Sequence, residues 1–308
     1  MIARHLLLAA TRAGVVRVTR PEGGSWAAEP ALPGHDVCCL AADRTTVYAG
    51  TQAGEVHRSN DGGATWARCG LAGVAVKSLA VDGALYAGTR EPRVHVSTDR
   101  GDSWRPLGGF PRLRSWWWAQ PAERPFRPSY VSAVALTSEG IVVGIEACGV
   151  FRSIDGGATW SGHRRAALRD CHELLADRGH VYEAGSGGLA ASDDGGATWS
   201  RRRAGLDRRY GWSVAADANV VYLAAAPYRA AHGAHSRARV FRSRAGRPWE
   251  PCTDELSTLP RLRAVEGEVF AALGDGSLIH SRDEGTSWEA LPVDLGSASR
   301  ALLALEPR

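Results

Sequence analysis

Lysine is almost missing from this chain of 308 residues: Lys77 is the single lysine among 37 basic residues. We attribute this preference for arginine over lysine to the base composition of the genome. The net charge of +4 is modest. Three arginine clusters, at Arg164–Arg165, Arg201–Arg203 and Arg208–Arg209, could contact phosphates but lack the interleaved aromatic residues of a nucleic-acid-binding stripe. Nucleic acid is therefore not the partner that we expect.

Regular disulfide spacing and long apolar runs are missing as well. The six cysteines contain no CxxC pair, so we expect reduced thiols. No apolar run reaches the roughly 18 residues of a membrane-spanning helix. The apolar stretch Leu6–Ala10 follows two basic residues but is shorter than a secretion signal, and Arg12 comes directly after it. We expect a cytoplasmic protein with no membrane partner.

An eight-residue segment ending in tryptophan recurs along the whole chain. It reads SNDGGATW at Ser59–Trp66; four other copies keep the aspartate, and two eroded copies have lost it. The seven segments end at Trp26, Trp66, Trp104, Trp160, Trp199, Trp249 and Trp288. Successive tryptophans are 40, 38, 56, 39, 50 and 39 residues apart. A period of roughly 40 residues is that of a four-stranded propeller blade.

The chemistry of this segment is that of a tight turn. An aspartate oxygen accepts backbone N–H groups, and the following glycines supply positive φ without a Cβ clash. Serine and threonine hydroxyls close the same turn, and the tryptophan packs a large apolar face between neighbouring sheets. We interpret the copies as structural fasteners of hairpins. Calcium or substrate binding would need seven equivalent sites, and two copies lack the aspartate.

These segments resemble the Asp-box, or bacterial neuraminidase repeat. Proteins with this repeat include sialidases, sortilin-type receptor propellers, photosystem II assembly factors and bacterial proteins named glycosyl hydrolases. The resemblance covers nearly the whole chain and implies a β-propeller. It implies no single activity, because the family contains both enzymes and non-catalytic binders.

The repeats predict an all-β fold, a seven-bladed β-propeller of four-stranded blades formed as one domain by residues 1–308. Only two candidate strands precede the first turn, so the first blade lacks its inner strand. The segment RALLALE, at Arg300–Glu306, follows the last complete blade. Pairing it beside Leu6–Ala10 would close the ring and remove the exposed sheet edges.

Strand direction places the Trp-terminated turns on one face of the ring and the irregular insertions on the other, around the mouth of the central channel. Two insertions explain the long spacings: Gly108–Ser129 and Pro227–Arg237. Variable loops with flat aromatic groups suit a small-molecule or glycan ligand, although the tryptophans could equally form a lid. The predicted ligand-binding residues are Arg90, Trp116, Trp117, Trp118, Trp212, Tyr228, Arg229, His232 and His235.

Three residues of this mouth are candidates for acid/base catalysis. Glu146 ends an apolar inner strand, where partial desolvation suits a general acid, and a salt bridge to a neighbouring arginine is the structural alternative. His172 opens an inner strand and could act as a base or remain a hydrogen-bonded structural residue. Tyr210 completes the set. A zinc or copper site is a further hypothesis, with His35, His172, His232 and His235 as its ligands.

Sialidase activity does not transfer residue by residue. That family holds the substrate carboxylate with three arginines, the first in a Phe-Arg-Ile-Pro motif, and uses a tyrosine with a glutamate partner as nucleophile. The nearest string here, Phe126-Arg127-Pro128, lacks the isoleucine and falls mid-chain. A clamp of Arg90, Arg112, Arg127 and Arg229, or a Tyr210–Glu146 pair, rests on no matching motif. The family's ring also has six blades, so classical sialidase activity is not expected.

Three hypotheses follow from the sequence. The first and preferred one is an enzyme whose mouth acts on a glycan or another polar small molecule by acid/base chemistry. The second is a non-catalytic propeller that binds a ligand or protein, and the third is a metal-dependent enzyme that uses the histidines of the mouth. The sequence names neither the substrate nor the oligomeric state.

Overall fold

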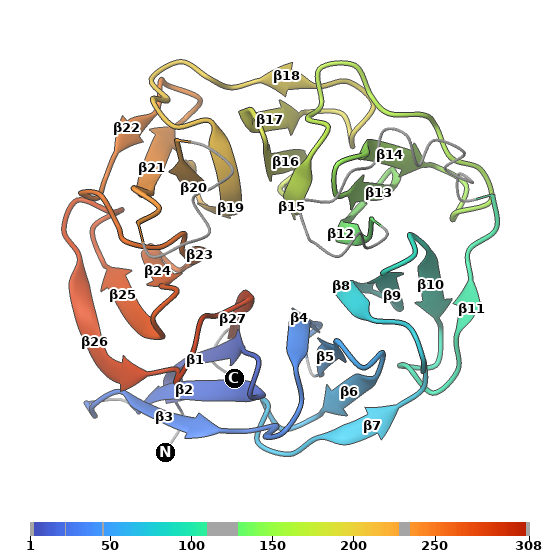
Figure 1. Cartoon of the computed structure of the whole chain (residues 1–308), viewed down its shortest axis with the longest axis horizontal. Coiled ribbons are helices and arrows are strands. Elements are labelled where there is room, and N and C mark those ends of the chain that lie inside the picture. The colour runs from blue at the N-terminus through green and yellow to red at the C-terminus, as the bar shows by residue number, and fades with distance from the viewer. Residues whose placement is uncertain (1–2, 22, 45, 110–128, 228–234, 306–308) are drawn as a thin grey trace.

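Seven antiparallel sheets stand around a central axis like the blades of a propeller (Figure 1). The computed structural model describes residues 3–21, 23–44, 46–109, 129–227 and 235–305. Every regular element in these ranges is a β-strand. The predicted all-β, seven-bladed ring is therefore confirmed.

Within each blade the strands follow one another from the centre of the ring to its rim (Figure 1). Blade 1 consists of β27 (Ala301–Leu305), β1 (Ala3–Ala10), β2 (Val15–Pro21) and β3 (Ala27–Pro30). Blade 2 consists of β4 (Val37–Ala42), β5 (Val47–Thr51), β6 (Val56–Ser59) and β7 (Ala67–Cys69). Blade 3 consists of β8 (Val76–Asp82), β9 (Ala84–Thr89), β10 (Val94–Ser97) and β11 (Arg105–Pro106). Blade 4 consists of β12 (Val131–Thr137), β13 (Gly140–Ile145) and β14 (Gly149–Ser153).

The remaining blades follow the same order. Blade 5 consists of β15 (Cys171–Asp177), β16 (His180–Gly185), β17 (Gly188–Ser192) and β18 (Ser200–Arg201). Blade 6 consists of β19 (Tyr210–Asp217), β20 (Val220–Ala226), β21 (Arg239–Arg244) and β22 (Glu250–Pro251). Blade 7 consists of β23 (Arg261–Val265), β24 (Glu268–Ala272), β25 (Ser277–Ser281) and β26 (Glu289–Asp294).

The hydrophobic core lies between the blades. Inner strand β4 alternates buried and half-buried residues, with Val37, Cys39 and Ala41 buried. Second strand β5 is buried at every position, because a neighbouring blade covers each of its two faces. Leu8 and Val37 share one apolar cluster, although they come from blades 1 and 2. Because the apolar side chains are buried between blades, the stable unit is the whole ring and not a single sheet.

Both ends of the chain meet in blade 1, as predicted. β27 pairs antiparallel with β1, in a register from Leu6 opposite Leu305 to Ala10 opposite Ala301. The Arg300 N–H also donates to the Ala10 carbonyl at 2.8 Å. Figure 1 shows β27 on the inner side of β1. The C-terminal strand therefore closes the ring.

Blade 4 has three regular strands, whereas each of the other blades has four. The segment after Trp160 still runs along β14, since the Ser161 N–H donates to the Arg152 carbonyl at 2.8 Å. Side chains replace backbone acceptors here: the Val150 N–H donates to His163 Nδ1 at 3.2 Å, and the Arg152 N–H to the Ser161 hydroxyl at 3.1 Å. A ladder made partly by side chains does not form a regular fourth strand.

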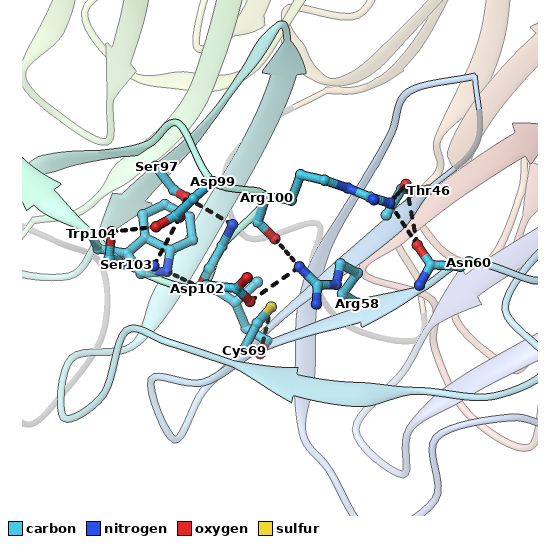
Figure 2. A network of polar contacts seen from close by, with 12 residues as sticks. Thr46, Arg58, Asn60, Cys69, Ser97, Asp99, Arg100, Asp102, Ser103 and Trp104 are labelled. Carbon is cyan, nitrogen blue, oxygen red and sulfur yellow. Dashed lines mark hydrogen bonds and ion pairs between the residues drawn. The ribbon is translucent and has the colours of Figure 1, made fainter.

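The five Trp-terminated turns that keep the aspartate have the serine and aspartate hydrogen bonds that their sequence predicts. In blade 3, the Ser97 hydroxyl donates to Asp99 and accepts the Gly101 N–H at 2.7 Å (Figure 2). Asp99 also accepts the Ser103 N–H at 2.9 Å, and the Trp104 indole donates to the Gly101 carbonyl at 2.9 Å. Gly101 has φ +98°, and a Cβ there would lie 2.9 Å from the Cys69 sulfur of blade 2. Glycine is therefore required by conformation and by the adjacent blade.

The same turn also ties its blade to the preceding one. Arg58 of β6 donates to the Arg100 carbonyl at 2.9 Å and to Asp102 at 3.1 Å (Figure 2). In return, the Arg100 guanidinium reaches the Thr46 hydroxyl and the Asn60 amide oxygen, both at 2.7 Å. The interpretation of these turns as fasteners agrees with this geometry.

We expect Asp194→Ala to lower the free energy of unfolding by about 1 kcal/mol. The Asp194 carboxylate accepts the Thr198 N–H at 2.8 Å and the Ser192 hydroxyl at 2.8 Å. Burial alone would raise its pKa, but hydrogen bonds from Thr198 and Ser192 lower it to about 2. The stabilisation is thus present above the unfolded pKa, near 3.9, and is lost as pH falls through the folded value.

Urea unfolding of the variant and the wild type at pH 7 and at pH 2.5 measures this effect. The difference between the two proteins should be largest at pH 7 and should shrink at pH 2.5. Asp254→Ala, at an exposed site outside the turns, is the control. An equal loss in the control at pH 7 would contradict the fastener role.

Candidate functional site

The mouth of the ring contains His172, whose side chain is only 5% exposed. Its Nδ1 lies 2.6 Å from the Gly211 carbonyl of blade 6, and its Nε2 lies 3.4 Å from the Asp170 carboxylate. The Tyr210 and Trp212 rings lie 4.6 and 5.2 Å from the imidazole, between centroids. Both ring nitrogens therefore face oxygen atoms of the protein, in the geometry of a hydrogen-bonded structural histidine.

Asp170 anchors this histidine and joins three loops of the mouth. Its carboxylate accepts the Ser186 hydroxyl at 2.6 Å and the Ala147 N–H at 3.1 Å. Burial alone would raise the pKa of Asp170, but the hydrogen bond and charge of His172, together with Ser186, hold it well below its ordinary value. The carboxylate stays ionised and fixes the imidazole in place.

Trp212 was predicted to offer its face to a ligand. In the structure the Arg261 guanidinium carbon lies 4.3 Å from its ring centroid, and Arg261 also donates to the Trp212 carbonyl at 3.3 Å. Glu173 accepts the Val214 N–H at 2.9 Å and lies 3.8 Å from Arg261. The face of the Trp212 ring is thus already in contact with the Arg261 guanidinium of blade 7.

Glu146 and Arg90 are brought together by Tyr130, across blades 3 and 4. The Glu146 N–H donates to the Tyr130 carbonyl at 3.1 Å, and Arg90 forms an isolated antiparallel bridge with Tyr130. The Arg90 guanidinium lies 4.8 Å from the Tyr130 ring centroid, and Lys77 lies 5.1 Å from the same centroid. Arg90 follows the second strand of its blade and Tyr130 precedes the first strand of the next, so these loops share one face, as the strand directions predicted.

The other predicted site residues are only partly described. His235 is exposed in a turn. His35 lies beside Glu55 and His57 in blade 2, and the structure does not bring it together with His172 of blade 5. Outside the described residues lie Trp116, Trp117, Trp118, Tyr228, Arg229, His232 and the sialidase-like candidates Arg112 and Arg127. The ligand and metal roles assigned to these residues stay predictions.

A cavity of about 600 Å³ lies elsewhere, between blades 5 and 6. Its walls come from four hairpin turns: β15–β16, β17–β18, β19–β20 and β21–β22. It therefore opens on the face of the Trp-terminated turns and not on the mouth. Tyr182, Val221 and Trp249 supply apolar surface to its lining. We call it the arginine cavity after the five arginines that line it: Arg178, Arg201, Arg202, Arg203 and Arg247.

The lining of the arginine cavity is strongly cationic. Against its five arginines stand two carboxylates, Asp177 and Asp193, which gives a formal charge of +3 with the histidine neutral. Asp193 is engaged already, at 2.7 Å from His180 and 3.4 Å from Arg202. Burial, and then the charges of neighbouring arginines, lower the pKa of Arg203. An anion placed here would relieve this repulsion.

The cavity coincides with the eroded turn of blade 6, SRAGRPW at Ser243–Trp249. In that copy the Trp249 indole donates to the Arg202 carbonyl of blade 5 at 3.0 Å, as the Trp288 indole does to the Cys252 carbonyl of blade 6 at 2.7 Å. The sequence held two signals for this site, the missing aspartate and the cluster Arg201–Arg203. The cluster was considered for phosphate contact and disfavoured for lack of interleaved aromatic residues, and no ligand site was predicted on this face.

Comparison with known proteins supports the fold. No protein-family model matches the sequence, and no curated protein matches it significantly. Solved structures do match. A candidate 6-phosphogluconolactonase from Bacteroides fragilis superposes with a TM-score of 0.69 at 12% identity, over 98% of each chain. YCF48 bound to D1 peptide superposes with a TM-score of 0.57 at 15% identity, over 82% of this chain and 80% of the other. An ancestral GH74 enzyme superposes with a TM-score of 0.58 at 17% identity, over 90% of this chain and only 39% of that enzyme.

These similarities establish a β-propeller architecture, which serves both enzymes and binding proteins. In the part of the chain that the structure describes, no helix is long and apolar enough to cross a membrane.

Proposed function

We propose that this protein is a non-catalytic binding propeller and that the arginine cavity takes a peptide segment rich in carboxylates. The observation that carries the proposal is the set of five arginines around a cavity of about 600 Å³, a volume within the usual range for ligand sites. Guanidinium groups bind carboxylates through paired, charge-assisted hydrogen bonds. The Asp-box superfamily is the family that we propose, on the repeats alone.

The apolar part of the lining favours a peptide over a bare inorganic anion. Tyr182, Val221 and Trp249 lie beside the arginines, so a segment with alternating acidic and aliphatic residues would satisfy both kinds of surface. The similarity to YCF48 bound to D1 peptide supports the proposal, because a protein of comparable fold binds a peptide. A cytoplasmic location remains a proposal, in keeping with the six free cysteines.

The enzyme hypothesis for Glu146, His172 and Tyr210 stays a prediction. The described contacts do not favour it, since His172 is 5% exposed and both of its nitrogens face protein oxygens. The two insertions that were predicted to border this mouth lie largely outside the described residues. The binding proposal therefore rests on the opposite face of the ring, where the arginine cavity opens.

Fluorescence anisotropy with a labelled peptide of alternating Glu and Leu tests the proposal. We expect the triple variant Arg178→Gln, Arg202→Gln, Arg247→Gln to bind this peptide on the order of 100-fold more weakly than the wild type, at about 1 kcal/mol for each lost charge-assisted contact. The side chains of Arg178 and Arg202 are 58% and 46% exposed, so the fold should tolerate the changes.

The matched control makes the same charge change elsewhere, with Arg105→Gln, Arg165→Gln and Arg282→Gln. Its affinity should stay within about twofold of the wild type at 0.15 M salt, where long-range attraction is screened. A second peptide with Gln in place of Glu should not bind. Equal weakening in both triple variants, or no binding by the wild type, would overturn the proposal.

A further inference from the structure

His35, Glu55 and His57 form the one group of three potential metal ligands among the described residues. We propose that this His35–Glu55–His57 triad is a binding site for a divalent transition metal, with Zn²⁺ the best match. Two imidazoles and one carboxylate are a ligand set that Zn²⁺ uses with water in the fourth position. The inference does not depend on the proposed peptide binding.

The spacing of the three ligand atoms fits one metal ion. Glu55 Oε2 lies 3.3 Å from His57 Nε2 and 3.5 Å from His35 Nδ1. Bonds of about 2.0–2.1 Å at tetrahedral angles separate two ligand atoms by roughly 3.3–3.4 Å. All three atoms lie within 4.8 Å of one another, so only the His35–His57 edge has to close.

The backbone holds the triad in place from both sides. His35 belongs to the connection between blades 1 and 2, whereas Glu55 directly precedes β6, which contains His57. The Gln52 N–H donates to the Asp36 carbonyl at 2.8 Å and joins these two segments. The Thr51 hydroxyl accepts the Glu55 N–H at 2.9 Å. Such preorganisation lowers the cost of gathering the ligands around an ion.

Access and depth also suit a metal site. The His57 side chain is 6% exposed, whereas those of Glu55 and His35 are 22% and 34% exposed. The two imidazole rings meet edge to face, with centroids 4.5 Å apart. An ion can therefore enter from the side of His35 and reach the buried His57.

Arg68 sets the expected strength of this site. Its Nε lies 3.3 Å from Glu55 Oε1, so one carboxylate oxygen is held and the other remains for the metal. The guanidinium is also a positive charge beside the site and opposes a cation. Its side chain is 60% exposed, which weakens that repulsion through solvent screening. We therefore expect one ion bound with moderate affinity, and tighter binding without Arg68.

Calorimetric titration of ZnCl₂ into protein made without a histidine tag tests the proposal. We expect one Zn²⁺ per chain and a rise in melting temperature of roughly 3–6 °C at saturating metal. His35→Ala and Glu55→Gln should each weaken binding at least about 10-fold, as should His57→Ala. Arg68→Ala should tighten it by roughly 3- to 10-fold.

His95→Gln, in another blade, is the control and should bind Zn²⁺ as the wild type does. Visible absorption of Co²⁺ at the same site gives a readout that does not depend on stability, which matters if His57→Ala folds poorly. Stoichiometry below one in the wild type, or unchanged affinity in both His35→Ala and Glu55→Gln, would show adventitious surface binding and overturn the proposal.

Discussion

Deletion of residues 299–308 is expected to lower the melting temperature by roughly 10 °C or more. The deletion removes β27, the inner strand of blade 1, and with it the ladder from Leu6–Leu305 to Ala10–Ala301. It also strips apolar cover from two of the clusters between blades, which include Leu302 and Leu303. Strand hydrogen bonds and half-buried leucines together contribute on the order of 5 kcal/mol.

A shorter deletion of residues 306–308, beyond the last residue of β27, is the control and should leave the melting temperature within about 2 °C. A synthetic peptide of residues 299–308, added in excess to the longer deletion, should restore part of the loss by pairing with β1. Without the peptide, the exposed edge of β1 should also promote association of chains, measurable by light scattering. Equal melting of the two deletions would show that β27 is not needed to close the ring.

Glu183→Gln is expected to stabilise the protein by about 3 kcal/mol at pH 8.5 and to leave it nearly unchanged at pH 4.5. Glu183 lies on β16 and is fully buried. Its Oε2 accepts the Leu168 N–H at 2.7 Å. Burial raises the pKa of Glu183 to about 8, while the bond from Leu168 opposes the shift.

The sign of this effect follows from proton binding. Between the unfolded pKa, near 4.3, and the folded value of about 8, the native state binds the proton and the unfolded state does not. Stability therefore falls as pH rises through this window and levels off above it. Glutamine keeps an oxygen for Leu168 and cannot ionise, so that decline should be smaller in the variant.

Guanidinium unfolding at pH 4.5, 6.5 and 8.5 measures how the free energy of unfolding depends on pH in the wild type and in Glu183→Gln. Glu91→Gln, at an exposed position, should follow the wild type at every pH. Parallel curves for Glu183→Gln and the wild type would mean that Glu183 is ionised at no cost in the folded state.

The ring could be predicted from the sequence because its determinants are local and repeated. Each Asp-Gly-Gly turn specifies its own hairpin, and the tryptophan spacing counts the blades. The closing strand was predictable because Arg300–Glu306 had no other partner, and β27 confirms it. The irregular edge of blade 4 was not predictable, since it depends on the His163 imidazole replacing a backbone carbonyl beside Val150.

The candidate sites were harder to predict, because they depend on contacts between blades. Nothing near His172 in sequence shows that the Gly211 carbonyl of blade 6 faces its ring. Similarly, His35 and His57 meet where a backbone hydrogen bond from Gln52 to Asp36 joins a loop of blade 2 to the connection between blades 1 and 2. The residue types showed which side chains could act as acids, bases or ligands. Their contact partners could not be predicted, because these come from the packing of one sheet against the next.

The eroded turn of blade 6 suggests how tandem duplication generates novelty. Five of the seven turns keep the aspartate, and the ring stays closed although two turns have lost it. In the blade 6 unit, which lacks the aspartate, the Trp249 indole bonds to blade 5 beside the arginine cavity. Redundancy among the copies thus allows an altered turn to become a recognition site, and other propellers with degenerate turns should be searched for cavities at the same boundary between blades.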